Sequence, residues 1–242
     1  MKAKLMIAAV AAAIGFSPVA KAEDLITDKD LGGKFSANVG VASEYFYRGL
    51  TQSGKGNPAI QGGFDFNHNS GFYIGNWNSS INFGGNIESD IYAGYTWEIG
   101  KTGYKPNLGV LYYHYPSSAP EKKYDMYEVY AGMTKDFGVA SGGVKFSYSP
   151  DEGGNGTSKD SQYLEANVDI PAGKYFTINL YGGRKWFSDN RGAGVDDYNT
   201  WALGVSAGVL GGTLKLAWVD NDLPNSQSAD MGRAVLSYTK SF

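Results

Sequence analysis

The sequence predicts an all-β fold: a transmembrane, antiparallel, up-and-down β-barrel of about 12 strands, the architecture of bacterial outer-membrane proteins. Three observations carry this prediction. Apolar residues recur with a period of two, short and long connections alternate along the chain, and the final residues 235–242 alternate in polarity and end on Phe242. A last strand with one apolar face closes a barrel when that face meets lipid.

The first 22 residues have the pattern of a secretory leader. Lys2 and Lys4 precede an apolar stretch at 5–16, and Ala20-Lys21-Ala22 forms a cleavage site of the small-x-small type. The apolar run is shorter than the roughly 20 residues that a membrane-spanning helix needs, which disfavours a retained helix. We therefore expect a cleaved signal peptide at 1–22, a short periplasmic segment at 23–34 and the barrel at 35–242.

Composition excludes several classes of protein. Without residues 1–22 the chain keeps 18 basic and 24 acidic residues, and this acidic balance argues against nucleic acid as a partner. No cysteine is present, so a disulfide framework, a thiolate metal site and a cysteine nucleophile are all excluded. The 34 glycines and the high aromatic content disfavour helix and suit strands and turns.

The strands follow from the polarity pattern. In segment 87–99, five isoleucine and aromatic positions share one face with Ala93, while Glu88, Asp90 and Glu98 share the other, which a helix would not allow. In the first segment, Tyr45 and Tyr47 continue the apolar face. The twelve predicted strands lie near 35–48, 58–67, 72–83, 87–99, 107–115, 124–135, 143–149, 162–170, 175–184, 198–209, 213–220 and 230–242.

The connections predict two different rims. Tight turns rich in Gly, Asn and Pro occur at 67–71, 136–138, 171–174 and 210–212, whereas long polar loops occupy 49–57, 116–123, 150–161, 185–197 and 220–229. Outer-membrane barrels place short turns in the periplasm and long loops outside the cell. A soluble barrel or sandwich is the alternative, and it would turn the apolar face into a core instead of towards lipid.

Aromatic residues near the strand ends favour the membrane alternative, because such rings settle at the headgroup level. The predicted girdle residues are Tyr45, Tyr47, Trp97, Tyr112 and Trp186. Tyr238 and Phe242 are the predicted signal for the barrel-assembly machinery, although Lys240 stands where such signals usually carry an apolar residue. The expected partners are therefore outer-membrane lipid and, during biogenesis, that machinery.

Residues 35–83 also carry a family resemblance. Segment 36–49 (SANVGVASEYFYRG), the following Thr51-Gln52-Ser53, segment 57–65 (NPAIQGGFD) and segment 70–77 (SGFYIGNW) resemble the opening strands of proteobacterial TorF-type porins. The remainder of the chain is similar to that family only in length, strand rhythm and aromatic terminus. The resemblance implies a barrel fold and passive diffusion of solutes.

Covalent chemistry is not expected. Of the two histidines, His68 lies in a predicted periplasmic turn, and His114 lies near the outer end of a strand, where a girdle position explains it. A lipid-modifying hydrolase using His114 remains the less favoured alternative. Segments 151–160 and 189–197 are rich in Asp, Asn and Gly but lack the spacing of a calcium loop, so no metal site and no cofactor are predicted.

The face opposite the lipid would line a lumen. The predicted pore-lining residues are Glu44, Arg48, Asp65, Glu88, Asp90, Glu128, Lys145, Glu165 and Arg233. Charged walls imply either water inside the barrel or a closing network of ion pairs. We therefore expect a porin-like channel for small hydrophilic solutes with a preference for cations, and the alternative is a non-conducting structural or adhesive barrel.

Overall fold

The computed structural model describes residues 28–83, 85–116, 124–152, 160–189, 196–224 and 232–242. The expected signal peptide at 1–22 and its cleavage site lie outside these residues, as do parts of the predicted loops. In the described residues, no helix is long and apolar enough to cross a membrane.

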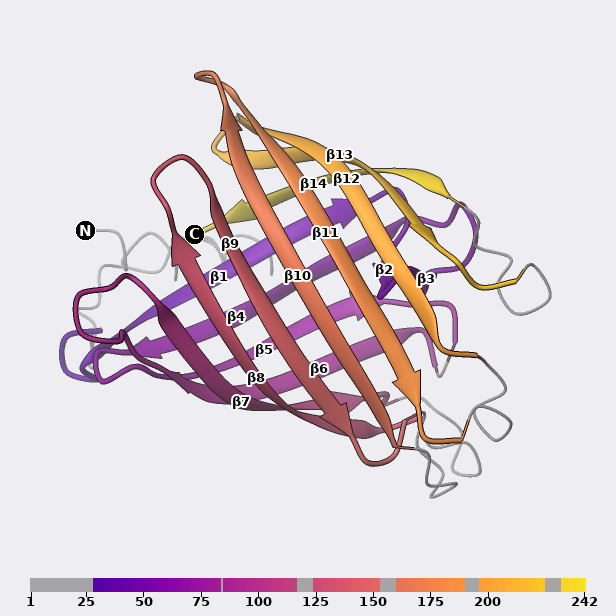
Figure 1. The fold of residues 1–242 in the computed structure, drawn as a ribbon, viewed down its shortest axis with the longest axis horizontal. Coiled ribbons are helices and arrows are strands. Elements are labelled where there is room, and N and C mark those ends of the chain that lie inside the picture. The colour runs from indigo at the N-terminus through magenta and orange to yellow at the C-terminus, as the bar shows by residue number, and fades with distance from the viewer. Residues whose placement is uncertain (1–27, 84, 117–123, 153–159, 190–195, 225–231) are drawn as a thin grey trace, which may run out of the picture.

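Twelve antiparallel strands close into one barrel, as the sequence predicted, and a separate two-stranded hairpin adds β2 and β3 (Figure 1). Each strand pairs with its neighbour along the chain, and β1 pairs with both β4 and β14. The barrel strands are β1 (Gly33–Ala42), β4 (Ala59–His68), β5 (Phe72–Ser80), β6 (Ile87–Thr96), β7 (Lys105–His114), β8 (Met126–Asp136), β9 (Ser141–Ser149), β10 (Ser161–Ala172), β11 (Phe176–Phe187), β12 (Tyr198–Val209), β13 (Gly212–Asn221) and β14 (Arg233–Ser241).

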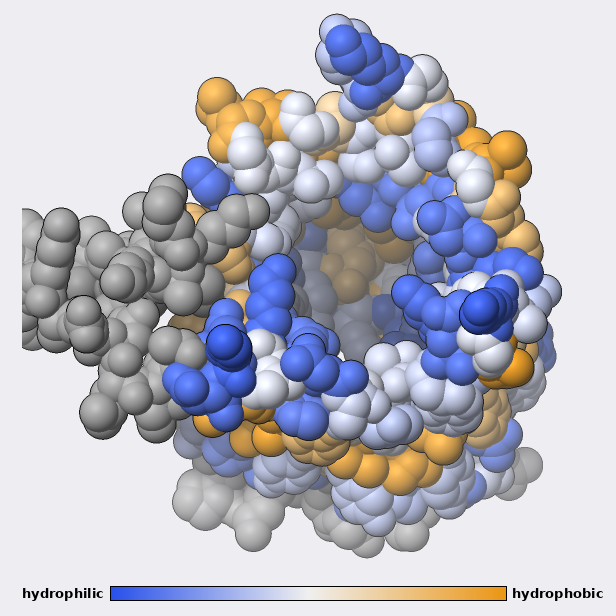
Figure 2. All heavy atoms as spheres, turned by 90° about the vertical axis from the view of Figure 1, so that its left-hand side faces the viewer, coloured by the Kyte–Doolittle hydropathy of each residue, from blue (hydrophilic) through white to orange (hydrophobic). Residues whose placement is uncertain are grey.

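The two faces of the wall differ in polarity. Large apolar side chains such as Ile91, Val110 and Leu203 are exposed on the outside of the barrel, whereas Glu88 and Glu128 are buried inside it. Figure 2 shows the apolar side chains gathered on the outer surface around a hollow rimmed by polar ones. Apolar side chains outside and polar ones inside are typical of a barrel in lipid, whereas a soluble β-protein has the opposite arrangement.

The connections define two rims. On the short-turn rim, β4–β5, β6–β7, β8–β9, β10–β11 and β12–β13 are joined through residues 69–71, 97–104, 137–140, 173–175 and 210–211. On the long-loop rim, the connections span residues 43–58, 81–86, 115–125, 150–160, 188–197 and 222–232. The predicted asymmetry is present with one exception, because connection 81–86 on the long-loop rim is shorter than connection 97–104 on the short-turn rim. β1 begins and β14 ends on the short-turn rim (Figure 1).

The prediction of the first strand, 35–48, was wrong at its C-terminal end. β1 stops at Ala42, and the chain then turns inward to form the hairpin of β2 (Phe46–Tyr47) and β3 (Leu50–Thr51), which we call the inward hairpin. Its two-residue turn, Arg48-Gly49, has φ angles of 50° and 81°. Two positive φ angles are typical of the primed turns that suit β-hairpins. The alternation of polarity is the same in a hairpin as in a strand, so periodicity could not separate them.

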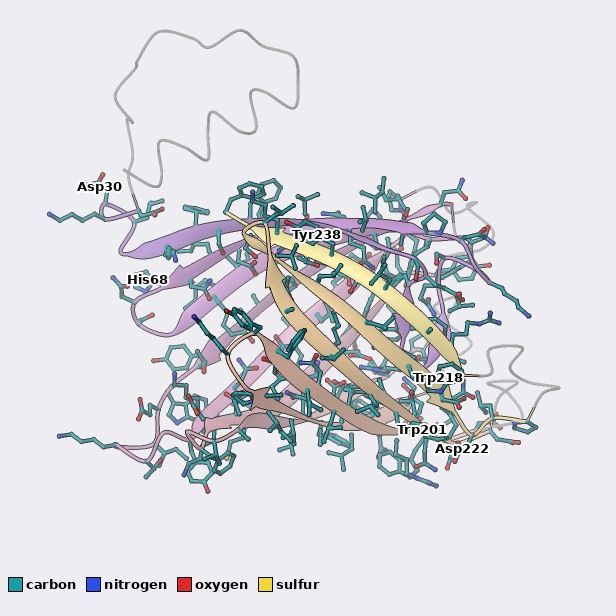
Figure 3. The ribbon with its side chains drawn as sticks, turned by 90° about the horizontal axis from the view of Figure 1, so that it is seen from above. Asp30, His68, Trp201, Trp218, Asp222 and Tyr238 are labelled. Carbon is teal, nitrogen blue, oxygen red and sulfur yellow. The ribbon has the colours of Figure 1, made fainter. Side chains whose placement is uncertain are left out.

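The aromatic girdle needs a matching correction. Tyr45 and Tyr47 do not face lipid, because their hydroxyls bind Glu88 and Tyr113 inside the barrel. Trp97 and Tyr112 are exposed, and the Trp186 ring is half-buried with the Arg184 guanidinium 5.5 Å from its centroid. Trp201 and Trp218, which are not among the predicted girdle residues, are exposed towards the long-loop rim, opposite the end that carries His68 (Figure 3).

We predict that Leu203→Arg, in the middle of β12, destabilises the barrel in a bilayer by about 2–4 kcal/mol, because its side chain faces hydrocarbon. The neighbouring Ala202→Arg, which points into the lumen cavity, is the matched control and should cost far less. Urea unfolding in lipid vesicles measures both. Equal losses for the two variants would contradict the assignment of the faces.

Candidate functional site

The lumen contains a chain of cavities. The largest, of about 650 Å³, lies beside the inward hairpin and is lined by residues from most of the barrel strands. A second cavity of about 510 Å³ shares Lys145, Glu165 and Asn167 with the first, and a third of about 460 Å³ shares Lys105 and Asn167 with the second. Figure 2 looks into the short-turn rim and shows the hollow at that end. The lumen is therefore spacious from its middle to this rim.

The inward hairpin narrows the lumen near the long-loop rim, and a buried ion pair anchors it. Arg48 donates two parallel hydrogen bonds to the Glu128 carboxylate, Nη1 to Oε1 at 2.6 Å and Nη2 to Oε2 at 2.8 Å. Its guanidinium also lies 4.2 Å from the centroid of the Tyr163 ring. Both charged residues are buried, at 8% and 2% exposure. Bidentate geometry of this kind fixes orientation as well as distance.

The tip of the hairpin reaches the opposite wall. Asn221, at the end of β13, donates a hydrogen bond from its side-chain amide to the Gly49 carbonyl at 2.8 Å. A Cβ atom at Gly49 would collide with the Thr200 side chain on β12. Glycine is thus required here by its positive φ and by this close approach. Because the hairpin contacts β8 on one side and β12 and β13 on the other, it spans the lumen.

Protonation states support this arrangement. Burial raises the pKa of the Tyr47 hydroxyl well above its ordinary value, so Tyr47 stays neutral. Burial alone would lower the pKa of the Arg48 guanidinium, but the charge and the hydrogen bonds of the Glu128 carboxylate beside it raise that pKa above its usual range. The anchor therefore keeps its positive charge at every physiological pH.

Six of the nine predicted pore-lining residues are brought together as three ion pairs. Besides Arg48–Glu128, Lys145 lies 2.7 Å from Glu165, and Arg233 lies 3.8 Å from Glu44. All but Glu128 and Arg233 line the largest cavity. These charges stabilise the wall and largely neutralise one another.

The other three predicted residues are acids on β4 and β6 without a cationic partner among the described residues. Asp65 accepts a hydrogen bond from the Tyr92 hydroxyl, and Glu88 accepts bonds from Tyr45 at 2.9 Å and Tyr115 at 2.7 Å. Asp90 is 7% exposed and its Oδ1 has no hydrogen-bond partner. One wall of the lumen therefore carries three acidic side chains that have no cationic partner among the described residues.

Sequence reasoning missed several lumen residues. Tyr163 is fully buried, and Lys185 lies 2.9 Å from Glu152 with almost no exposure. Trp77 and Tyr113 line the largest cavity. Tyr163, Trp77 and Tyr113 occupy inward positions of their predicted strands, but the predicted pore-lining set contained charged residues only. Lys185 was placed in a loop, because the predicted strand ended at 184 whereas β11 runs to Phe187.

His114 lies on the outward side of the wall at the long-loop rim. Its Nδ1 is 2.9 Å from Asp125 Oδ2, and the Tyr112 ring stacks on it. Burial would raise the pKa of Asp125, but hydrogen bonds from Tyr115, Tyr112 and His114 hold that pKa below its ordinary value. No described serine hydroxyl is hydrogen-bonded to His114, so the nucleophile that a hydrolase needs is not assembled in the described residues.

Most of the Asp-rich segments 151–160 and 189–197 lies outside the described residues. Within the described part of the chain, no group of three or more His, Asp or Glu side chains is placed to hold a metal ion. The sequence lacks Cys altogether.

A closed, lipid-facing barrel with a polar lumen and an inward constriction defines the chain as a porin-like β-barrel. The chain belongs to the family described as "Bacterial protein of unknown function (Gcw_chp)", whose model matches residues 28–241. No curated protein matches it by sequence.

Solved structures show the same fold. The KdgM porin aligns with a TM-score of 0.57 at 11% identity, covering 86% of this chain and 99% of that one. The NanC porin also aligns with 0.57 at 11% identity, covering 85% and 98%. An outer-membrane channel from Pseudomonas putida F1 aligns with 0.51 at 8% identity, covering 93% and 100%. At these identities the likeness is one of fold.

We predict that Arg48→Met destabilises the barrel by about 3–5 kcal/mol, because it leaves the Glu128 carboxylate buried and unpaired. The double variant Arg48→Met/Glu128→Met should recover most of this loss. Lys145→Met, which breaks a pair that is 41% exposed on the lysine side, is the control and should cost about 1 kcal/mol or less. Denaturant unfolding measures the stability of all three variants. A double variant as unstable as Arg48→Met would contradict the role of the Arg48–Glu128 pair as the anchor of the hairpin.

Proposed function

We propose that this protein is an outer-membrane channel for the passive diffusion of small hydrophilic solutes, exported by the signal peptide expected at residues 1–22. The observation that carries the proposal is the chain of polar cavities running from the inward hairpin to the short-turn rim. Diffusion needs a wet path with few apolar contacts, and this lumen offers one. The resemblance of residues 35–83 to TorF-type porins supports the same function.

We further propose that the channel prefers cations. Three ion pairs leave Asp65, Glu88 and Asp90 without a cationic partner among the described residues, on adjacent parts of one wall. Lys105, Asp169 and Lys215 line the lumen cavities from other strands. Acidic groups facing a narrow aqueous path raise the local concentration of cations and lower that of anions. The proposal involves no covalent chemistry and no cofactor.

A non-conducting structural barrel is the second candidate, and the inward hairpin favours it. The hairpin is held on both sides, by Glu128 and by Asn221, near the long-loop rim. In that case the lumen would be a pocket open to the periplasm only. Electrical measurements separate the two candidates.

Purified protein in a planar bilayer should give discrete current steps. Across a salt gradient, the reversal potential should shift towards the equilibrium potential of the cation. Charge reversal of Glu88 and Asp90 together, to Lys, should lower this cation preference because both side chains point into the barrel from β6 and Asp90 lines the largest cavity. Reversal of Asp30, which is exposed before β1 and is not among the residues lining the three lumen cavities, is the control. Unchanged selectivity in the double variant would count against a conducting path along this wall, and silence across many insertions would favour the structural barrel.

Removing the inward hairpin should widen the path. Replacement of residues 46–51 by two glycines deletes the segment that spans the lumen while β1 and β4 keep their pairing. We expect single-channel conductance to increase at least severalfold, since the narrowest section sets the resistance. A shortened loop at 222–232 on the same rim serves as the control. Conductance equal to that of the unmodified protein would show that the hairpin does not restrict the flow.

A further inference from the structure

The wall beneath the inward hairpin contains a carboxylate surrounded by aromatic rings. On β6, Asp90 is in register with Trp77 of β5 on one side and with Tyr113 of β7 on the other. Residues directly opposite each other in an antiparallel sheet share a face, so the three side chains form one row on the lumen wall. Tyr45, from the segment that leads into the hairpin, packs edge-on against Trp77 with ring centroids 5.4 Å apart.

We call these four residues, Trp77, Asp90, Tyr113 and Tyr45, the Asp90 cage. All four line the largest cavity of the lumen; Trp77 and Tyr45 are half-buried and Tyr113 is 3% exposed, so a solute there meets chiefly the rings of Trp77 and Tyr45. The tyrosine hydroxyls are already engaged, since Tyr45 donates to Glu88 and Tyr113 donates to Glu128. The rings are thereby fixed in orientation, and what they still offer a solute is their aromatic surface.

Asp90 lacks the partner that a buried carboxylate requires. It is 7% exposed, its Oδ1 has no hydrogen-bond partner, and no Lys or Arg among the described residues pairs with it. Glu88 and Glu128 add negative charge nearby, and the charge of Glu128 is balanced by Arg48. A buried carboxyl without a partner ionises at a cost, and a cation held beside it lowers that cost, so this position is suited to binding a mobile cation.

The surroundings select the kind of cation. A bare metal ion needs several oxygen ligands, and in the described residues no three acidic or histidine side chains are placed to supply them. Aromatic faces beside a carboxylate are instead suited to a weakly hydrated organic cation, which gains cation–π attraction from the rings and a charge pair from the acid. The cavity of about 650 Å³ has room for such a molecule.

We propose that the Asp90 cage binds the ammonium group of a small organic cation, such as an alkylated or quaternary ammonium compound. The inference rests on the proposed channel function and specifies its solute class. The cage lies beside the narrowing made by the inward hairpin, so a cation held there also obstructs the smaller ions that share the path.

Choline chloride is a suitable probe. Isothermal titration with the full chain in detergent should show saturable binding, and choline added to a bilayer should block potassium current at similar concentrations. Its neutral carbon analogue, 3,3-dimethyl-1-butanol, should do neither, because it has the same shape without the charge. Equal binding of the neutral analogue would overturn the proposal.

Variants locate the site. Asp90→Asn and Trp77→Leu should each raise the half-saturating choline concentration by about tenfold or more, whereas Trp77→Phe, which keeps an aromatic face, should have an intermediate effect. Glu98→Gln makes the same change of charge away from the cage and should leave choline binding unchanged. Thermal unfolding of each variant, followed by circular dichroism, verifies the fold. Unchanged binding in both Asp90→Asn and Trp77→Leu would overturn the assignment.

The two readouts separate this inference from the proposed function. Potassium currents without choline binding would disprove the cage and leave the channel standing. Choline binding that depends on Asp90, in a protein that gives no current, would leave the cage standing and disprove the channel.

Discussion

The structure depends on one constraint: in hydrocarbon every backbone N–H and C=O group must be paired, so the sheet has to close on itself. Closure is completed between β1 and β14, where five residue pairs are in register, compared with ten between β1 and β4. Two contacts extend this short seam. The Phe242 backbone bonds Ala37, and Ser43 bonds Leu236 through its backbone N–H and through its side chain. The last residue of the chain therefore takes part in closing the wall.

The number of strands in the closed barrel also determines how much interior space must be filled. Twelve strands enclose more space than their inward side chains occupy, as the cavities between the hairpin and the short-turn rim demonstrate. The inward hairpin fills the section near the long-loop rim with a backbone segment, and the buried pair Arg48–Glu128 compensates for the two charges it brings together. The same segment places Tyr45 against Trp77 and so contributes to the Asp90 cage.

The wall of the barrel could be predicted from sequence because its signal is repeated in every strand. Strand number, the two faces and the difference between the rims follow from polarity alternation and turn residues, as at Ile91 and Glu88 or at Gly211. The inward hairpin was missed because 43–51 keeps the same alternation, and whether such a segment extends the wall or folds inside depends on distant partners such as Glu128 and Asn221. The pairing of lumen charges was beyond reach for the same reason: Lys145 and Glu165 meet only once β9 and β10 are in register.

The anchor of the inward hairpin has a consequence for the order of assembly. Arg48 leaves β1 early in the chain, yet its carboxylate partner belongs to β8, and the surface that receives Gly49 belongs to β12 and β13. Contacts between residues so far apart in sequence form late, because the intervening chain must first be arranged. The hairpin can therefore make all of its contacts only when β8, β12 and β13 are in place. Until β8 is in place Arg48 lacks the Glu128 carboxylate, so we expect docking of the hairpin to be a late step of assembly.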